Sequence, residues 1–346
     1  MKIDFSIQNL PDPETAFENQ VTAFIQEWFD DSKTVKVQTS GSTGTPKVFD
    51  IEKERMQYSA NKTCDILQLI EGDSALLCLP VDYISGKMMV VRAIERKLTL
   101  LVKTPSINPL TDLNQVINFC AMSPLQVENS LDKIHLIKNI IIGGAAVSES
   151  LKTKITHRLK NEKSTLENRI YETYGMSETL SHIALKQIYP AAEDYFKVLD
   201  GVEISLDERG CLQIFAPKLN PETLLTNDLV EINNDKEFRF LGRVDNVINS
   251  AGLKIYPEQL ETLVKKEIEN EVIFLGIKNE LLGQKLVLII EAEESPAIIQ
   301  QLKQIVYPSK NHQPKEIIFV EKFPRIPNGK IDRRELIEMV LDMVNK

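Results

Sequence analysis

The sequence contains few of the residues that build disulfide frameworks or metal sites. Its four cysteines are scattered along 346 residues, with neither a CxxC pair nor a histidine cluster beside them. We therefore expect the cysteines to be small buried side chains of a protein in a reducing cytoplasm, rather than disulfide partners or metal ligands. The cysteines are Cys64, Cys78, Cys120 and Cys211.

Long hydrophobic runs are also missing. The longest, such as residues 286–290, are far too short to cross a bilayer, and residues 1–12 show no signal-peptide pattern. The net charge of −9 argues against nucleic acid as the main partner, although local basic residues could still line a pocket for a small anion. Neither repeats nor low-complexity tracts are visible. What remains is an ordinary globular composition without stable membrane insertion, and nothing in it indicates an oligomeric state.

The length and the order of apolar segments predict two domains. A chain of 346 residues is long for one core, and strands alternating with helices indicate an α/β protein. We place the boundary at 244/245, between a large N-terminal mixed α/β domain (residues 1–244) and a small C-terminal α+β domain (residues 245–346). A helix is predicted over 256–270, and a strand-and-turn region over 210–240. Buried strands are predicted at 75–79, 98–102, 140–142, 272–277, 286–290 and 317–320.

Residues 39–47 combine five hydroxyl side chains, two glycines and a lysine. Inward-facing N–H groups, hydroxyl donors and one positive charge can together surround a polyphosphate. The spacing is not that of a P-loop, because Pro46 and Val48 stand where a glycine and a Ser/Thr are needed. The alternative is a flexible polar surface loop. The candidate phosphate-binding residues are Thr39, Ser40, Gly41, Ser42, Thr43, Gly44 and Lys47.

Five further segments join this loop in a characteristic order. Together the six resemble the adenylate-forming superfamily of acyl-CoA synthetases, nonribosomal adenylation domains and luciferases, over residues 39 to about 336. The resemblance implies an enzyme that converts a small-molecule carboxylic acid and ATP into an acyl adenylate with Mg²⁺, and then into a coenzyme A thioester. The five segments are 143–147, 174–179, 226–229, 242–261 and 324–330.

The resemblance assigns residues to the phosphate chemistry. Attack of a carboxylate on the α-phosphate brings two anions together, so positive charge and N–H donors must be concentrated there. Residues 39–47 would hold the β- and γ-phosphates, Ser177 would contact the α-phosphate, and Glu178 would ligate Mg²⁺. The alternative for Ser177 and Glu178 is an ordinary helix N-terminus, with the serine as its cap.

The same resemblance assigns the nucleoside contacts. Asp228 would accept both ribose hydroxyls, assisted by Arg243; a plain turn residue is the alternative for the aspartate. The adenine pocket would be formed by glycines that admit a flat base and an aromatic ring that stacks on it. A β-turn with a core tyrosine is the alternative there. The adenine-pocket residues are Gly143, Gly144 and Tyr174, and Gly175 is a further cofactor-binding candidate.

The small domain would supply the catalytic lysine. By resemblance, Lys330 reaches into the cleft and stabilises charge between the carboxylate and the α-phosphate; an isolated lysine here would be an ordinary basic loop residue. Family members swing this domain about a hinge near Asp245, exchanging the lysine face for one that guides coenzyme A. Gly252 would let the pantetheine arm approach the backbone closely, with a tight hairpin turn as the alternative.

Two departures from the family pattern stand out. The phosphate loop begins only at residue 39, so this looks like a compact version whose large domain is shortened at its N-terminus. Tyr83 stands where many relatives carry a histidine at the acid pocket, and we expect it to form an aromatic wall instead.

Segments 86–92 and 179–184 look most like the compact o-succinylbenzoate–CoA ligases of menaquinone biosynthesis. That substrate has two carboxylates; one reacts, and the other needs a cationic or hydrogen-bonding partner. Candidates are Lys87, Arg92, Ser181 and His182. The alternative is an ordinary amphipathic helix with polar cleft residues, and we prefer it for Arg92 and His182 taken individually.

Two other functions stay open. A stand-alone adenylating enzyme could load a carrier protein in trans, because no carrier segment follows Lys330. A nucleotide-binding regulator that has lost the chemistry is disfavoured, because Lys330, Glu178 and Asp228 are all present.

Overall fold

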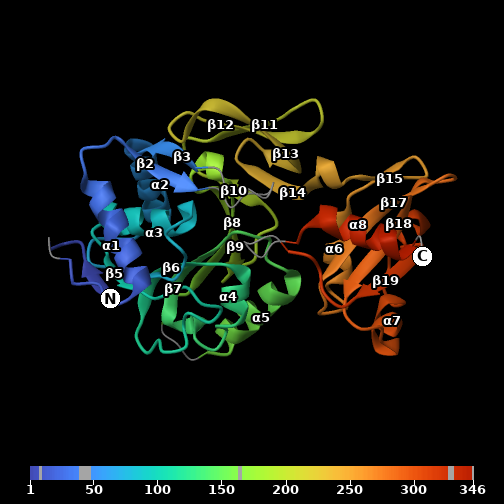
Figure 1. Ribbon diagram of the computed structural model, residues 1–346, viewed down its shortest axis with the longest axis horizontal. Helices are drawn as coiled ribbons and strands as arrows, with labels where there is room; N and C mark the ends of the chain where they lie inside the picture. The colour runs from blue at the N-terminus through green and yellow to red at the C-terminus, as the bar shows by residue number, and fades with distance from the viewer. Residues whose placement is uncertain (8–9, 39–47, 163–165, 326–330, 345–346) are drawn as a thin grey trace.

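A 12-stranded mixed sheet forms the centre of the N-terminal part of the chain (Figure 1). The computed structural model describes residues 1–7, 10–38, 48–162, 166–325 and 331–344. In sheet order the strands are β1 (Lys2–Asp4), β5 (Thr99–Val102), β4 (Ser74–Leu77), β6 (Ile117–Met122), β7 (Ile137–Ile142), β8 (Arg169–Gly175), β9 (His182–Tyr189), β10 (Phe196–Val198), β14 (Glu237–Arg243), β13 (Asn220–Asn234), β12 (Cys211–Ala216) and β11 (Glu203–Leu206).

The five strands from β5 to β8 are parallel, and the other pairs in this sheet are antiparallel. Parallel strands are covered on both faces, which is why β4, β5 and β7 appear in the sequence as short apolar runs. The predicted runs 75–79, 98–102 and 140–142 overlap these strands. The strand-and-turn region predicted over 210–240 is confirmed as β12, β13 and β14.

Helices cover the two faces of the large sheet. Alternate residues of β4 face opposite ways, so Leu77 packs in one core and Leu76 in the other. The first core also contains residues of α1 (Ala16–Phe29), α2 (Lys53–Ile66) and α3 (Ile84–Glu95). The second contains residues of α4 (Pro124–Glu128), the 3₁₀ helix η1 (Ile134–Leu136) and α5 (Glu149–Lys160). A separate hairpin pairs β2 (Thr34–Gln38) with β3 (Val48–Glu52).

The C-terminal part of the chain forms a second, five-stranded sheet, the orange-to-red region of Figure 1. Its two faces carry separate cores, with Leu288 in one and Ile289 in the other. The predicted strands at 272–277, 286–290 and 317–320 are present. The elements are β15 (Ile248–Ser250), β16 (Leu253–Ile255), α6 (Pro257–Val264), β17 (Val272–Asn279), β18 (Gly283–Glu291), α7 (Pro296–Leu302), η4 (Lys310–His312), β19 (Glu316–Val320) and α8 (Arg333–Val344).

The predicted fold class is confirmed: a large mixed α/β unit and a smaller α+β unit. The helix predicted over 256–270 is too long, because α6 ends at Val264. Beyond it the chain tightens, with the Glu267 amide bonded to the Val264 carbonyl at 3.0 Å. Ile268 is nevertheless buried, since one further turn keeps it on the apolar side. Apolar spacing alone cannot distinguish such a turn from a longer helix.

The boundary predicted at 244/245 falls in η3 (Val244–Asn246), the short 3₁₀ helix between β14 and β15. It stays a prediction. Just before it, a Cβ on Gly242 would lie 2.4 Å from Glu258 Oε2, so the end of β14 closely approaches α6. Asn246 Nδ2 also donates to Glu258 Oε1 at 2.6 Å. Glycine is favoured at 242 by its φ of +150°.

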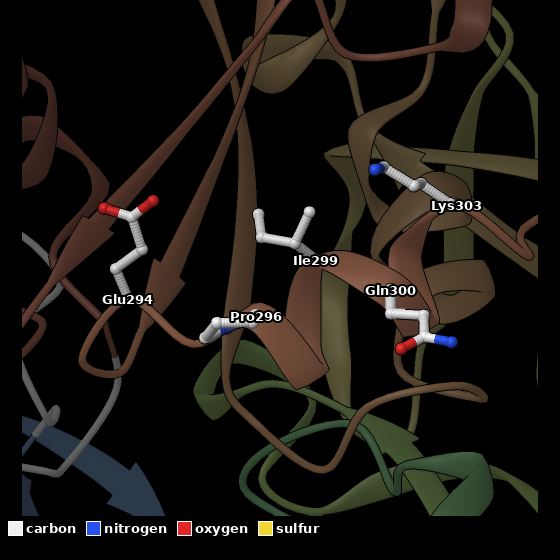
Figure 2. A pocket seen from close by; sticks show the side chains of 5 residues that line it. All are labelled: Glu294, Pro296, Ile299, Gln300 and Lys303. Carbon is white, nitrogen blue, oxygen red and sulfur yellow. The ribbon is translucent and has the colours of Figure 1, made fainter.

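The described residues form two cavities of note, and the second includes Lys87, a candidate for binding the acid. One of about 600 Å³ on the small unit is lined by Glu294, by three residues of α7 and by Lys303 just after that helix (Figure 2). The other, of about 320 Å³, lies between α1, β2 and Lys87. Neither contains a constellation suited to adenylation. No helix of the described residues is long and apolar enough to cross a membrane.

Candidate functional site

Three predicted site residues meet at one carboxylate. Asp228 on β13 accepts a hydrogen bond from the Tyr174 hydroxyl at 2.6 Å, on Oδ2, and one from Arg243 Nη1 at 3.1 Å, on Oδ1. The sheet register explains the second contact, because Asp228 and Arg243 lie directly opposite each other on β13 and β14. Each carboxylate oxygen is oriented by one donor and keeps capacity for a further one. The arrangement can accept a pair of ligand hydroxyls.

The ring of Tyr174 packs in an aromatic cluster. It meets Phe238 edge-on, with 5.0 Å between centroids, and Phe196 at 5.9 Å. Burial, reinforced by the charge of Asp228, raises the pKa of the Tyr174 hydroxyl well above its usual range, so the phenol stays protonated and acts as a donor. The ring is therefore packed in the core, which was the alternative considered for Tyr174. Stacking of this ring on the adenine base stays a prediction.

The glycines assigned to the adenine pocket and the further candidate Gly175 lie where backbones come close. A Cβ on Gly143 would lie 2.7 Å from Thr173 Oγ1, and one on Gly175 would lie 2.4 Å from the Ser181 carbonyl oxygen. Gly144 has φ of +87°, a conformation that favours glycine. Segment 143–147 therefore runs closely past the end of β8.

Ser177 and Glu178 lie in the 3₁₀ helix η2 (Ser177–Thr179). Met176 occupies the cap position, so Ser177 is not the N-cap that the alternative proposed, and its hydroxyl has no hydrogen-bond partner among the described residues. Glu178 is exposed, and its carbonyl accepts from Asn220 Nδ2 at 3.2 Å. Metal-binding side chains form no group of three or more in the described part of the chain. A cation at Glu178 would thus need phosphate or water oxygens to complete its coordination.

The four candidates for binding a second carboxylate separate into two places. Arg92 Nη2 donates to Ser181 Oγ at 2.5 Å, and Ser181 Oγ lies 3.2 Å from His182 Nδ1. Lys87 faces α1 instead, with Nζ 3.7 Å from Glu27 Oε2 and 4.1 Å from the centroid of the Phe24 ring. The structure therefore gathers three candidates and separates Lys87 from them.

Arg92 is buried, and the described residues give it no counter-ion. Its exposed fraction is 2%, and no acidic side chain of the described chain lies within ion-pair distance of its guanidinium. Its Nε has no hydrogen-bond partner there either. Burial lowers its pKa to about 10, so it remains charged at neutral pH. The preference for an ordinary amphipathic-helix role is wrong for this residue, because such a helix would place an arginine at the surface.

His182 is neutral at the same place. Burial, and then the charge of Arg92, lower its pKa to about 3. Its Nε2 lies 3.4 Å from Thr63 Oγ1 on α2. His182 can therefore offer a substrate a hydrogen bond but no positive charge.

The remaining predicted residues lie apart or outside the described residues. Tyr83 is half-buried at the start of α3, where its backbone bridges Gln38; an aromatic-wall role stays a prediction. Gly252, with φ of +78°, forms with Ala251 the tight turn between β15 and β16. A tight hairpin turn was the alternative considered for Gly252, and its contact with coenzyme A stays a prediction. The phosphate loop 39–47 and Lys330 lie outside the described residues.

Sequence reasoning missed Glu172. This carboxylate on β8 is 5% exposed and lies between two lysines, 3.3 Å from Lys152 Nζ and 3.0 Å from Lys186 Nζ. Its Oε1 accepts from the Val147 amide at 3.0 Å. No sequence signal could have revealed this cluster, because its members come from different elements and none belongs to a recognisable motif.

Known proteins resemble the whole chain, although no protein-family model matches it. The acyl-CoA synthetase (AMP-forming)/AMP-acid ligase II-like protein from Dyadobacter fermentans, a solved structure, is 34% identical, with 98% of this chain and 99% of that one covered at a TM-score of 0.65. A 2-succinylbenzoate–CoA ligase from Listeria monocytogenes is 25% identical over 90% of this chain and 71% of its own length. O-succinylbenzoate coenzyme A synthetase (MenE) from Bacillus subtilis, solved with ATP and magnesium ion, shares the fold at 19% identity and a TM-score of 0.71, with 87% and 69% covered.

Proposed function

The chain belongs to the acyl-CoA synthetase (AMP-forming)/AMP-acid ligase II-like family, and from that membership we propose that it is an ATP-dependent acid–CoA ligase. The reaction proceeds in two steps through an acyl adenylate, releasing pyrophosphate and then AMP. Its acid is o-succinylbenzoate, which makes it an enzyme of menaquinone biosynthesis acting in the cytoplasm. The name of the Listeria relative supports this substrate.

The observation that carries the substrate proposal is the unpaired charge of Arg92. An ionised group this deeply buried is costly unless an opposite charge joins it. A monocarboxylic acid has no second carboxylate to pair with Arg92, since its only carboxylate must face ATP. A diacid presents a second carboxylate, which the Arg92 guanidinium and the Ser181 hydroxyl can bind together.

The chemistry then divides between two groups of residues. Asp228, oriented by Tyr174 and Arg243, accepts the ribose hydroxyls. Ser177, whose hydroxyl is uncommitted, contacts the α-phosphate, and Lys330 balances the charge that grows between carboxylate and phosphorus. Mg²⁺ would be held by Glu178 together with phosphate oxygens, and it would supply further charge neutralisation.

A panel of carboxylic acids tests the proposal. The protein is incubated with ATP, Mg²⁺ and each acid, and pyrophosphate release and coenzyme A thioester are measured separately. We expect both products with o-succinylbenzoate and much less of either with its monocarboxylic analogues. Turnover of an aliphatic or amino acid instead would refute the substrate. Pyrophosphate release without any thioester would favour a carrier protein as the acceptor, and no pyrophosphate with any acid would favour a regulator.

Replacing Lys330 separates the two half-reactions. We expect Lys330→Ala to slow adenylation at least about a hundredfold, because a charge aimed at the transition state is lost. Thioester formation from supplied acyl adenylate should continue, since that step does not need this lysine. Lys322→Ala, at an exposed position shortly before segment 324–330, is the matched control. Wild-type adenylation by Lys330→Ala would show that the lysine has no such role.

A further inference from the structure

Glu172 lies at the centre of a buried charge cluster that the proposed chemistry does not use. Lys186 is its direct cross-strand neighbour on β9, and Lys152 reaches it from α5. Burial lowers the pKa of Lys186, while the charges of Glu172 and Glu149 raise that of Lys152. Two cations thus share one buried carboxylate oxygen, Glu172 Oε2.

The carboxylate also holds the segment between β7 and α5. Glu172 Oε1 accepts a hydrogen bond from the Val147 amide. The next residue, Ser148, is the N-cap of α5, and its hydroxyl accepts from the Leu151 amide at 3.1 Å. At the other end of the segment, Thr173 Oγ1 donates to the Ile142 carbonyl at 3.1 Å. Adjacent residues of β8 therefore fix both ends of the segment 143–147.

The cluster extends to the other wall of the nucleoside site. Lys186 Nζ lies 4.4 Å from the centroid of the Phe196 ring, and that ring meets Tyr174, which holds Asp228. A continuous row of contacts therefore runs from Val147 through Glu172 and Lys186 to the carboxylate proposed to bind ribose. One end of this row lies in the segment 143–147, which contains the two glycines assigned to the adenine pocket, and the other is the carboxylate assigned to the ribose.

We propose that Glu172 is a positioning residue for ATP: its carboxylate, held between Lys152 and Lys186, fixes the segment 143–147 in the conformation that receives the base. The proposal rests on the proposed function, because Gly143 and Gly144 of this segment are assigned to the adenine pocket by resemblance to the superfamily. Glu172 itself has no contact with the nucleotide. Its effect is transmitted through the Val147 amide, so it should change ATP binding and leave the chemical step largely unchanged.

The experiment removes the hydrogen bond between the Val147 amide and Glu172 without leaving a buried lysine that lacks an acidic partner. Lys186→Met serves as the background, because methionine preserves contact with Phe196 and Lys152 still has Glu149 at 2.8 Å. In that background Glu172→Gln retains an oxygen that can accept from Val147, whereas Glu172→Leu retains none. Both double variants lack the carboxylate charge, so they are matched in electrostatics. Calorimetric titration with ATP alone gives Kd, steady-state assays give KM and kcat, and thermal unfolding monitors the fold.

We expect Kd and KM for ATP to be about tenfold or more higher in the leucine variant than in the glutamine variant, with kcat within about threefold and KM for the acid unchanged. Equal Kd values in the two variants would overturn the proposal. A parallel fall in kcat and rise in every KM, together with a lower Tm, would show a merely structural role and would also overturn it. Failure of the unsubstituted protein to bind ATP would instead refute the proposed function, so the two failures are distinguishable.

Discussion

Arg92 and Glu172 are both buried charged residues, but they differ in the charged partners that surround them. Arg92 packs in the core that contains α1, α2 and α3, near the ring of Phe119, and the described residues give it no acidic partner. Glu172 lies on the side of α5, between two lysines and a backbone amide. Glu172 has two ion-pair partners, whereas Arg92 has none among the residues that the structure describes.

The difference indicates what each charge is for. A buried charge that the protein pairs by itself can hold backbone segments in place, because breaking the pair leaves an uncompensated ion. A buried charge without a partner stabilises nothing in the free protein, and its cost is recovered only when an anion binds. We therefore infer a structural and positioning role for Glu172 and a ligand-binding role for Arg92.

The largest expected effect on stability is at Glu172. Because Glu172→Leu leaves Lys186 buried without its counter-ion, the free energy of unfolding should fall by about 3–5 kcal/mol. Urea denaturation measures it. Glu149→Gln is the control, since it removes the half-exposed partner of the same Lys152 and should change stability by less than about 1 kcal/mol. Equal losses in the two variants would remove the contrast between a satisfied cluster and a surface pair.

Arg92 should show the converse behaviour, with activity lost and stability kept. We expect Arg92→Met to lower kcat/KM for o-succinylbenzoate by about a hundredfold, because the second carboxylate loses its charged partner. The free energy of unfolding should stay unchanged or rise by about 1–2 kcal/mol, because a buried charge is replaced by an apolar side chain. Arg96→Met, which removes an arginine paired with Asp65 just after the same helix, is the control. A strongly destabilised Arg92→Met with normal kinetics would reverse the assignment.

The smallest expected effect concerns pH and the neighbour of Arg92. The pKa of His182 is about 3 in the folded protein, against 6.5 as its ordinary value, so the unfolded chain takes up a proton first as the pH falls. The stabilising contribution is complete above about pH 6.5 and is lost progressively toward about pH 3. Between about pH 6 and about pH 5, the wild type should lose roughly 1.4 kcal/mol more stability than His182→Gln in urea titrations. Parallel pH profiles would show that His182 is not buried in its neutral form.

Local patterns in the sequence were enough to predict much of the fold. The apolar runs that became β4, β5, β7, β17, β18 and β19 are short and uninterrupted because both of their faces are covered. The end of α6 was not predictable in this way, since Ile268 keeps the apolar spacing after the helix has ended. Periodicity reports which side of an element is buried, and much less reliably where the element stops.

The candidate site shows the same division. Asp228 and Arg243 were assigned from their segments, but their pairing depends on the β13–β14 register. The hydroxyl of Tyr174 on β8 reaches Asp228 although three strands separate β8 from β13 in the order of the sheet. Arg92 was undervalued and Glu172 overlooked for one reason. A charged residue's role depends on which charges surround it after folding, and its neighbours in the chain do not indicate this.

By itself, therefore, the sequence determined the two-unit α/β architecture and the motif order that signals adenylate chemistry, because both depend on local composition and spacing. Only the tertiary structure decided which buried charges are paired and which side chains share a carboxylate. It also decided that Lys87 and Arg92, on one helix, contact different parts of the protein. The physical reason is that desolvation and Coulomb energy depend on three-dimensional distances, which are set when distant strands and helices pack together.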